Sequence, residues 1–134
     1  MNPFFTPFKE KSLVVQDYVD QHIQNMSFNE IIGWMASPLP FELIEQEPVL
    51  KQVNTIFKIA RIGVLRMDPN RVYKWHQDRH RGVTINMLLT PNDHSHCLFT
   101  NTNVNQTPDD QYDVTELKYE ERRFYLFNTD CYHS

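Results

Sequence analysis

Glycine is scarce in this sequence, with three residues in 134. A phosphate-binding loop needs glycines so that the backbone can approach the phosphates, and their shortage argues against nucleotide chemistry. Basic residues form no long cluster, and the formal net charge is -4 with a pI near 5.8. The sequence therefore lacks the positive surface that is typical of nucleic-acid binders, and we expect no nucleic acid among its partners.

Cysteines and long apolar runs are also few. Cys97 and Cys131 are the only two cysteines. Two are too few for a disulfide scaffold and lack the Cys-x-x-Cys spacing of a zinc site, so we expect reduced thiols. No apolar run reaches the roughly 20 residues of a membrane span, and residues 1–13 lack the apolar stretch of a signal peptide. We predict a soluble, cytoplasmic protein that does not bind membranes.

The length and the hydrophobic content of 40% predict a single domain, residues 1–134. Its first part, residues 1–58, is expected to be a helical cover. Apolar positions at three- and four-residue spacing, ended in one case by prolines, predict helices over residues 12–25, 29–35 and 47–57. Ser12 is the predicted N-cap of the first helix.

The pattern changes near residue 59. Short β-branched or aromatic runs separated by turn residues predict six strands, over residues 59–67, 72–76, 82–90, 94–101, 114–119 and 124–128. The polar residues 102–113 predict a loop, either a flap that faces a substrate or simple surface. Helices followed by strands favour a mainly β fold of the α+β type, with antiparallel sheets.

The strongest chemical signal is the pair His76 and Asp78, two residues apart after a strand-like run. In a strand such residues share a face and lie about 7 Å apart. With a second histidine they would form the two-histidine, one-carboxylate triad of iron(II) oxygenases, which leaves open coordination positions. The alternative is a solvated turn, which the pair alone favours. His133 follows four further predicted strands, where a two-sheet roll would return beside His76.

Together these residues carry a resemblance to a known family. The segments LRMDP (65–69) and YKWHQD (73–78), residues 81–89 and the late FN and HS pairs resemble the iron(II)- and 2-oxoglutarate-dependent oxygenases, in an aspartyl/asparaginyl β-hydroxylase-like or prolyl-hydroxylase-like branch. The resemblance covers residues 59–134. It implies a double-stranded β-helix, or jelly roll, with His76, Asp78 and His133 as iron ligands. It also implies 2-oxoglutarate as a co-substrate that is decarboxylated to succinate.

One feature of that family is missing. Its members hold the far carboxylate of 2-oxoglutarate with a basic residue on a final core strand, whereas this sequence ends at Ser134. We expect a truncated chain whose final core strand is absent; a strand from a partner chain and a substitute basic residue are the alternatives. An uncovered sheet edge would also favour a homodimer.

Further candidates surround the triad. Arg81 is a possible substitute anchor, because a guanidinium binds a carboxylate through two hydrogen bonds, or else a surface residue. Thr84 and Asn86 have the opposite parity to the apolar residues of their strand, so we expect them to face the barrel mouth and bind co-substrate or water. Trp75 is either a core residue or part of the rim of a substrate pocket.

The sequence predicts an iron(II)- and 2-oxoglutarate-dependent dioxygenase of unknown substrate. A non-catalytic jelly-roll metal-binding module is one alternative. Another is a cupin-like metal enzyme that does not use 2-oxoglutarate, with His94 and His96 as a ligand pair, although no glutamate follows them at the cupin distance. No Ser-His-Asp or Cys-His arrangement is recognisable, which argues against a hydrolase with a serine or cysteine nucleophile.

Overall fold

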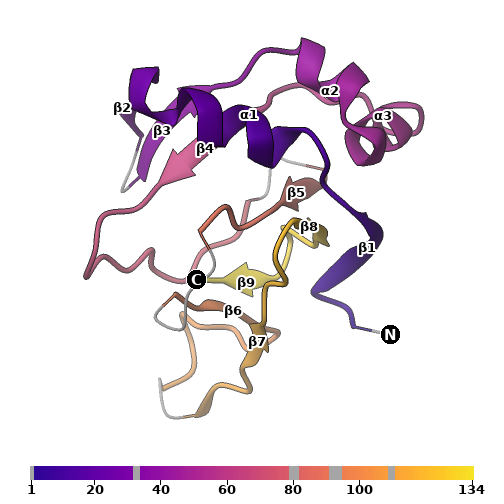
Figure 1. Cartoon of the computed structure of the whole chain (residues 1–134). Coiled ribbons are helices and arrows are strands. Elements are labelled where there is room, and N and C mark those ends of the chain that lie inside the picture. The colour runs from indigo at the N-terminus through magenta and orange to yellow at the C-terminus, as the bar shows by residue number, and fades with distance from the viewer. Residues whose placement is uncertain (1, 32–33, 79–81, 91–94, 109–110) are drawn as a thin grey trace. The chain divides into compact units, whose positions relative to one another are not determined.

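The computed structural model describes the chain except for residues 1, 32–33, 79–81, 91–94 and 109–110 (Figure 1). The described residues form three sheets of three strands and several short helices, so the predicted mainly β fold is confirmed. None of the described helices is long and apolar enough to cross a membrane. In chain order the elements are β1 (Phe5–Lys11), α1 (Val15–His22), η1 (Ile23–Asn25), β2 (Asn29–Ile31), β3 (Trp34–Pro38), α2 (Glu42–Gln46), α3 (Pro48–Asn54), β4 (Gly63–Arg66), β5 (Thr84–Asn86), β6 (Cys97–Thr100), β7 (Thr115–Leu117), β8 (Arg123–Phe127) and β9 (Tyr132–His133).

The chain divides into two compact units. The first, called here the β unit, consists of Met1–Lys9 and Val72–Ser134. The second, called here the helix-containing unit, is Glu10–Arg71. All three residues of the predicted triad belong to the β unit, so the site can be described within that unit alone.

A buried carboxylate organises the start of α1 in the helix-containing unit. Glu47 is fully buried, and its Oε2 accepts hydrogen bonds from Ser12 Oγ at 2.7 Å and from the amides of Val14 and Val15 at 2.9 and 3.1 Å. The N-cap position is Val14, which has no side-chain cap of its own. The predicted N-cap role of Ser12 is therefore wrong: Glu47, far along the chain, caps the helix, and Ser12 serves as a donor to it.

The helix predictions have different outcomes. The helix predicted over residues 12–25 is confirmed as α1 and η1, and that over residues 47–57 as α3, while α2 was not predicted. The helix predicted over residues 29–35 is wrong, because this segment contributes to β2 and β3. Pairing decides the matter: β3 is the central strand between β2 and β4, so distant backbone partners outweigh the local helical spacing.

Glycine eases a close approach where β3 meets β4. Gly63 lies opposite Pro38, and a Cβ atom there would lie 3.0 Å from the carbonyl oxygen of Ser37. That oxygen belongs to the backbone, so a side chain at residue 63 would require the two strands to separate by a few tenths of an ångström. Gly63 thus permits the close approach of β3 and β4 in this sheet.

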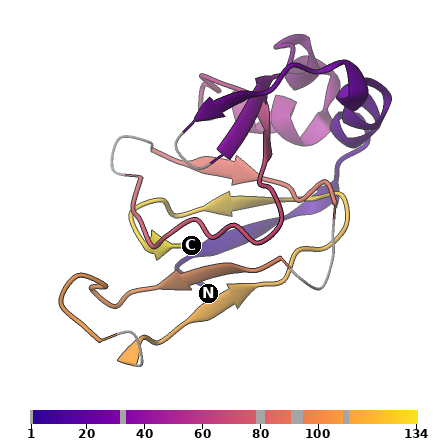
Figure 2. The same ribbon diagram turned by 90° about the vertical axis from the view of Figure 1, so that its left-hand side faces the viewer.

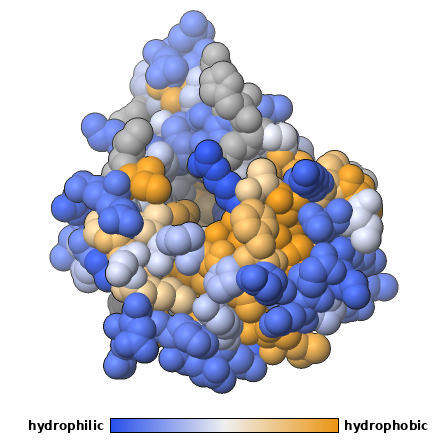
Figure 3. All heavy atoms as spheres, turned by 90° about the horizontal axis from the view of Figure 1, so that it is seen from above, coloured by the Kyte–Doolittle hydropathy of each residue, from blue (hydrophilic) through white to orange (hydrophobic). Residues whose placement is uncertain are grey.

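Apolar side chains are also exposed on the helix-containing unit, among them Phe41, Ile56 and Phe57. Figure 3 shows apolar side chains interrupting a face that also carries many polar residues. Exposed apolar residues are ordinary on small proteins, and we assign these no function.

Two sheets build the β unit (Figure 2). Their strand orders are β1-β8-β5 and β7-β6-β9. The strands predicted over residues 82–90, 94–101, 114–119 and 124–128 contain β5, β6, β7 and β8, and β4 lies within the one predicted over residues 59–67. The strand predicted over residues 72–76 is wrong: the segment makes a single isolated bridge, from His76 to His133. The pairing stops at His76, because the next amide bond of this segment, from Asp78, goes to the carbonyl oxygen of Thr129, outside β9.

An aromatic core joins these two sheets. Phe99 of β6 is completely buried, and its ring centroid lies 5.1 Å from that of Phe127 in β8 and 5.7 Å from that of Phe4. Leu117 of β7 and Tyr125 of β8 complete the buried cluster. Side chains from both sheets thus share one core, which holds the sheets together by burial of apolar surface.

Replacing Glu47 with alanine should destabilise the protein by about 3 kcal/mol, because the hydroxyl of Ser12 and the first amides of α1 would lose their acceptor in a buried place. Urea unfolding followed by circular dichroism measures the change. Glu45→Ala, in the exposed part of α2, is the matched control and should change stability by less than about 0.5 kcal/mol. Equal unfolding midpoints for the two variants would contradict this role of Glu47.

Candidate metal centre

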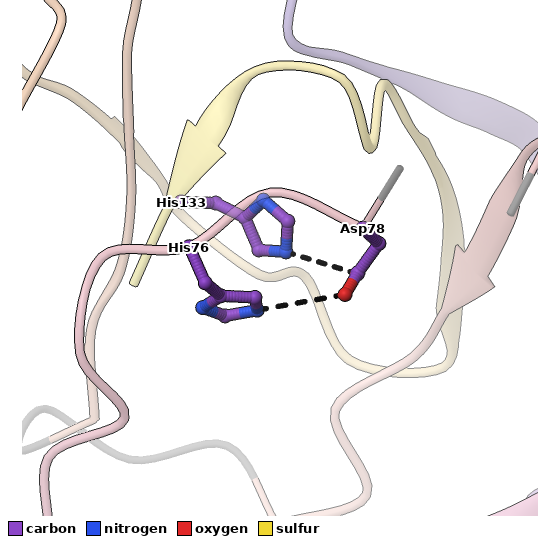
Figure 4. A group of neighbouring side chains, drawn as sticks. All are labelled: His76, Asp78 and His133. Atoms are coloured by element: carbon purple, nitrogen blue, oxygen red, sulfur yellow. Dashed lines mark ion pairs between the residues drawn. The ribbon is translucent and has the colours of Figure 1, made fainter. Parts of the chain in front are cut away.

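The structure brings the three predicted ligands together (Figure 4). His76 and Asp78 come from the irregular segment that precedes β5, and His133 comes from β9. One ligand atom of each residue lies within 4.8 Å of the others. His133 Nε2 is 3.3 Å from Asp78 Oδ2, and His76 Nε2 is 3.9 Å from Asp78 Oδ1. Residues distant in sequence therefore form one compact cluster.

Backbone hydrogen bonds fix the two segments against each other. The amide of His76 donates to the carbonyl oxygen of His133, and the amide of His133 donates back to His76, both at 3.0 Å. The amide of Asp78 donates to the carbonyl oxygen of Thr129 at 2.9 Å, and Thr129 is almost completely buried. These bonds hold the three side chains together through the backbone, although two of them come from an irregular segment.

The hydrogen bonds of both imidazoles determine which nitrogen faces Asp78. His76 Nδ1 lies 2.8 Å from the carbonyl oxygen of Lys74, and His133 Nδ1 lies 2.9 Å from that of Cys131. A carbonyl oxygen can only accept, so each Nδ1 carries the proton. In the neutral ring Nε2 then presents a lone pair, which is the tautomer that a metal ion binds.

Three acceptors consequently converge. Two Nε2 lone pairs and the carboxylate of Asp78 face one point, and no pair among them can form a hydrogen bond while the rings are neutral. Ligands that share one ion at about 2.1 Å and right angles lie roughly 3 Å apart. The nitrogen–oxygen distances here, 3.3 Å to Oδ2 and 3.9 Å to Oδ1 of Asp78, are somewhat longer, and the three ligand atoms lie within 4.8 Å of one another, so small shifts would bring them onto one ion. The chemistry of the donor set fits a divalent metal ion.

The cluster lies at the edge of the aromatic core. The ring of His133 is 6.0 Å from that of Phe99, and the ring of Tyr73 meets His76 edge-on at 4.1 Å. The side chains of His76 and Asp78 are 25% and 22% exposed, against 11% for His133. One side of the cluster is therefore packed and the other is accessible, as a site that admits a small molecule requires.

Sequence reasoning missed two contributors to this arrangement. It assigned no role at the site to Tyr73, whose aromatic ring packs against that of His76 three residues later. It gave no role to Thr129, whose carbonyl oxygen holds Asp78. The residue type gives no signal for this role, because any residue supplies a backbone carbonyl oxygen.

The other predicted site residues have varied positions. Thr84 pairs with Phe127 and Asn86 with Tyr125, so both share the face of the sheet that carries buried core residues. Arg81 lies outside the described residues. The ring of Trp75 packs edge-on against Tyr112 at 5.9 Å.

The cupin-like pair is represented by one residue, because His94 lies outside the part of the chain that the structure describes. His96 Nδ1 lies 2.6 Å from Glu116 Oε1, and Lys118 Nζ lies 3.0 Å from Glu116 Oε2. The hydrogen bond from His96, followed by that from Lys118, lowers the pKa of Glu116. We interpret this exposed group as a surface ion cluster of small energetic weight.

Comparisons of the chain with models of protein families, with curated proteins and with solved structures find no match. The arguments on function therefore rest on the geometry and chemistry of the site itself.

The thiol of Cys97 is unsuited to nucleophilic chemistry. Cys97 packs against the aromatic core, and burial raises the pKa of its thiol from 9.0 to about 11, although a hydrogen bond with Tyr119 acts in the opposite direction. The thiolate is the reactive form, so Cys97 is almost entirely in its unreactive form near neutral pH.

Alkylation should reveal this protection. At pH 8 a thiol with a pKa of about 11 is deprotonated about a hundredfold less often than one with a pKa of 9.0, so iodoacetamide should modify Cys97 at least about a hundredfold more slowly in the folded protein than in urea. Mass spectrometry of the peptide that contains Cys97 measures both rates. Equal rates in the two conditions would show that the thiol is not protected.

Proposed function

We propose that this chain is an iron(II)- and 2-oxoglutarate-dependent dioxygenase of the double-stranded β-helix, or jelly-roll, class. The observation that carries the proposal is the convergence of His76 Nε2, His133 Nε2 and the carboxylate of Asp78, with both Nδ1 atoms bound to carbonyl oxygens. Two histidines and one carboxylate on one side of an ion leave further coordination positions for substrate and dioxygen.

The number and type of ligands favour this chemistry over structural zinc binding. Structural zinc sites are closed by four protein ligands, commonly cysteine and histidine, whereas the described residues offer a group of three without cysteine. When bound, iron(II) would supply the activation of dioxygen that couples decarboxylation of 2-oxoglutarate to hydroxylation of a C–H bond. The protein residues would hold the ion on one side and leave the accessible side to the reactants.

The arrangement of strands supports the proposed fold class. Two antiparallel sheets share a core, and the segment with His76 and Asp78 lies beside the strand that carries His133. A jelly roll brings such distant segments together in the same way. In this reading Thr84 and Asn86, on the core-facing side of β5, contact the co-substrate, which leaves the primary substrate unassigned.

Removing one ligand should abolish tight binding of a divalent ion. We expect His76→Ala and Asp78→Ala each to weaken binding of Fe(II) or Mn(II) by at least about a hundredfold, because two of three ligands cannot replace the third. Anaerobic titration with a competing chelator measures the affinity. His22→Ala, an exposed histidine of α1, is the control and should bind as the unaltered protein does.

Unchanged metal content in His76→Ala would contradict the proposed site. A protein that binds the ion but forms no succinate from 2-oxoglutarate under any substrate tested would instead support the alternative of a metal-binding module without turnover. The two measurements therefore separate the site from the activity.

The proposed co-substrate contacts can be tested separately. Thr84→Val and Asn86→Leu remove polar groups from the core-facing side of β5 with small changes in volume, and we expect each to weaken 2-oxoglutarate binding about tenfold while the affinity for Fe(II) stays the same. Anaerobic calorimetry on the Fe(II)-loaded protein measures this. Ile85→Val, on the other face of the same strand, is the matched control. Equal affinities in all variants would remove these contacts from the proposal.

A further inference from the structure

The face of the β7-β6-β9 sheet that lies opposite the aromatic core is also covered. Phe99 pairs with His133 on the core side, whereas the next pair, Thr100 and Tyr132, belongs to the other side of the sheet. Thr100 is nevertheless completely buried, and its Oγ1 accepts a hydrogen bond from the amide of Thr102 at 3.0 Å. This bond bends the chain directly after β6.

Part of that chain contacts the residues next to the two histidines. The residues concerned, Asn103 to Asn105 in sequence together with Tyr112, are called here the backing segment. The ring of Tyr112 packs edge-on against Trp75 at 5.9 Å, and Asn105 Nδ2 donates to the hydroxyl of Tyr132 at 3.3 Å. Trp75 directly precedes His76, and Tyr132 directly precedes His133.

The backing segment is tied together internally. The hydroxyl of Tyr112 donates to the carbonyl oxygen of Val104 at 2.8 Å, which joins its two parts. The side chain of Asn103 accepts from the amide of Asn105 at 3.1 Å, and its carbonyl oxygen accepts from the amide of Gln106 at the same distance. A loop with these bonds keeps a defined shape. It can therefore hold Trp75 and Tyr132 at a fixed distance from each other.

We propose that the backing segment is a positioning element for the metal centre: by holding Trp75 and Tyr132 it fixes the spacing of the His76 and His133 imidazoles. The inference rests on the proposed metal site. A metal ion tolerates little change in the positions of its ligands, and partners behind the ligands commonly contribute ten- to a hundredfold to affinity. The loop predicted as either a flap or simple surface thereby receives a structural role behind the site.

Such coupling must act in both directions. If docking of the backing segment strengthens metal binding by some factor, metal binding must strengthen docking by the same factor. The amides of Asn105 and Gln106 report on the internal order of the segment, because both donate to Asn103. Their exchange with solvent should slow when the metal binds.

The experiment measures Zn(II) affinity by competition with a chelator in the full chain. We expect Tyr112→Ala and Asn105→Ala each to weaken binding about tenfold, and Tyr112→Phe, which keeps the ring against Trp75 but loses the bond to Val104, to weaken it less. Gln106→Ala, an exposed neighbour, is the matched control and should bind normally. In the unaltered protein Zn(II) should slow exchange at Asn105 and Gln106 about tenfold, without effect on the amide of Tyr18 in α1.

The possible results are distinct. Equal Zn(II) affinity in Asn105→Ala, Tyr112→Ala and the unaltered protein would overturn the positioning role, even if thermal stability fell. If Tyr112→Ala does not fold, Asn105→Ala and Tyr112→Phe still decide the question. If the unaltered protein binds no Zn(II), Fe(II) or Mn(II), the proposed function fails as well, whereas normal binding with no effect of the variants rejects the positioning role alone.

Discussion

The pair of backbone hydrogen bonds between His76 and His133 is the contact on which the site depends. Each bond measures 3.0 Å, and together they join an irregular segment to a strand of two residues. Without them, His76 and Asp78 would belong to a solvated turn, the alternative that their spacing favoured. These bonds place almost no restriction on residue type, because any residue but proline supplies a backbone donor and acceptor. The side chains can therefore be selected for chemistry alone.

The aromatic core gives this contact its rigidity. Phe99 touches rings from both sheets and lies 6.0 Å from the ring of His133, so the same burial that stabilises the β unit also limits the movement of one ligand. The backbone bonds between Ser134 and Leu98, both 2.9 Å, extend this control to the residue after His133. Packing and backbone pairing thus act on the same few residues, which is how a small unit can hold three polar side chains in a fixed geometry.

The sequence predicted the site residues more completely than it predicted the helices and strands. Spacing alone joined His76 to Asp78, the order of the predicted strands suggested His133 and the family resemblance gave it a ligand role, and only the structure shows the three together. Strand parity predicted that Thr84 and Asn86 face a barrel mouth, and the structure pairs them with the core residues Phe127 and Tyr125. The errors have a common cause: residues 29–35 and 72–76 were judged from local periodicity, whereas their conformations follow from strand partners far along the chain. Capping by Glu47 is non-local in the same way.

Glu47 is fully buried and Asp78 is partly buried. Their neighbours explain why Glu47 has a structural role whereas Asp78 is a candidate metal ligand. Glu47 is surrounded by a hydroxyl and backbone amides, all donors, so its negative charge is already stabilised by hydrogen bonds. Asp78 instead faces the Nε2 atoms of two imidazoles whose protons are committed to carbonyl oxygens. Three acceptors turned toward one another form a set that a cation can bind. A proton can join them only by charging an imidazole, whereas a divalent ion can bind all three groups at once, so the arrangement of acceptors supports the proposed metal ion.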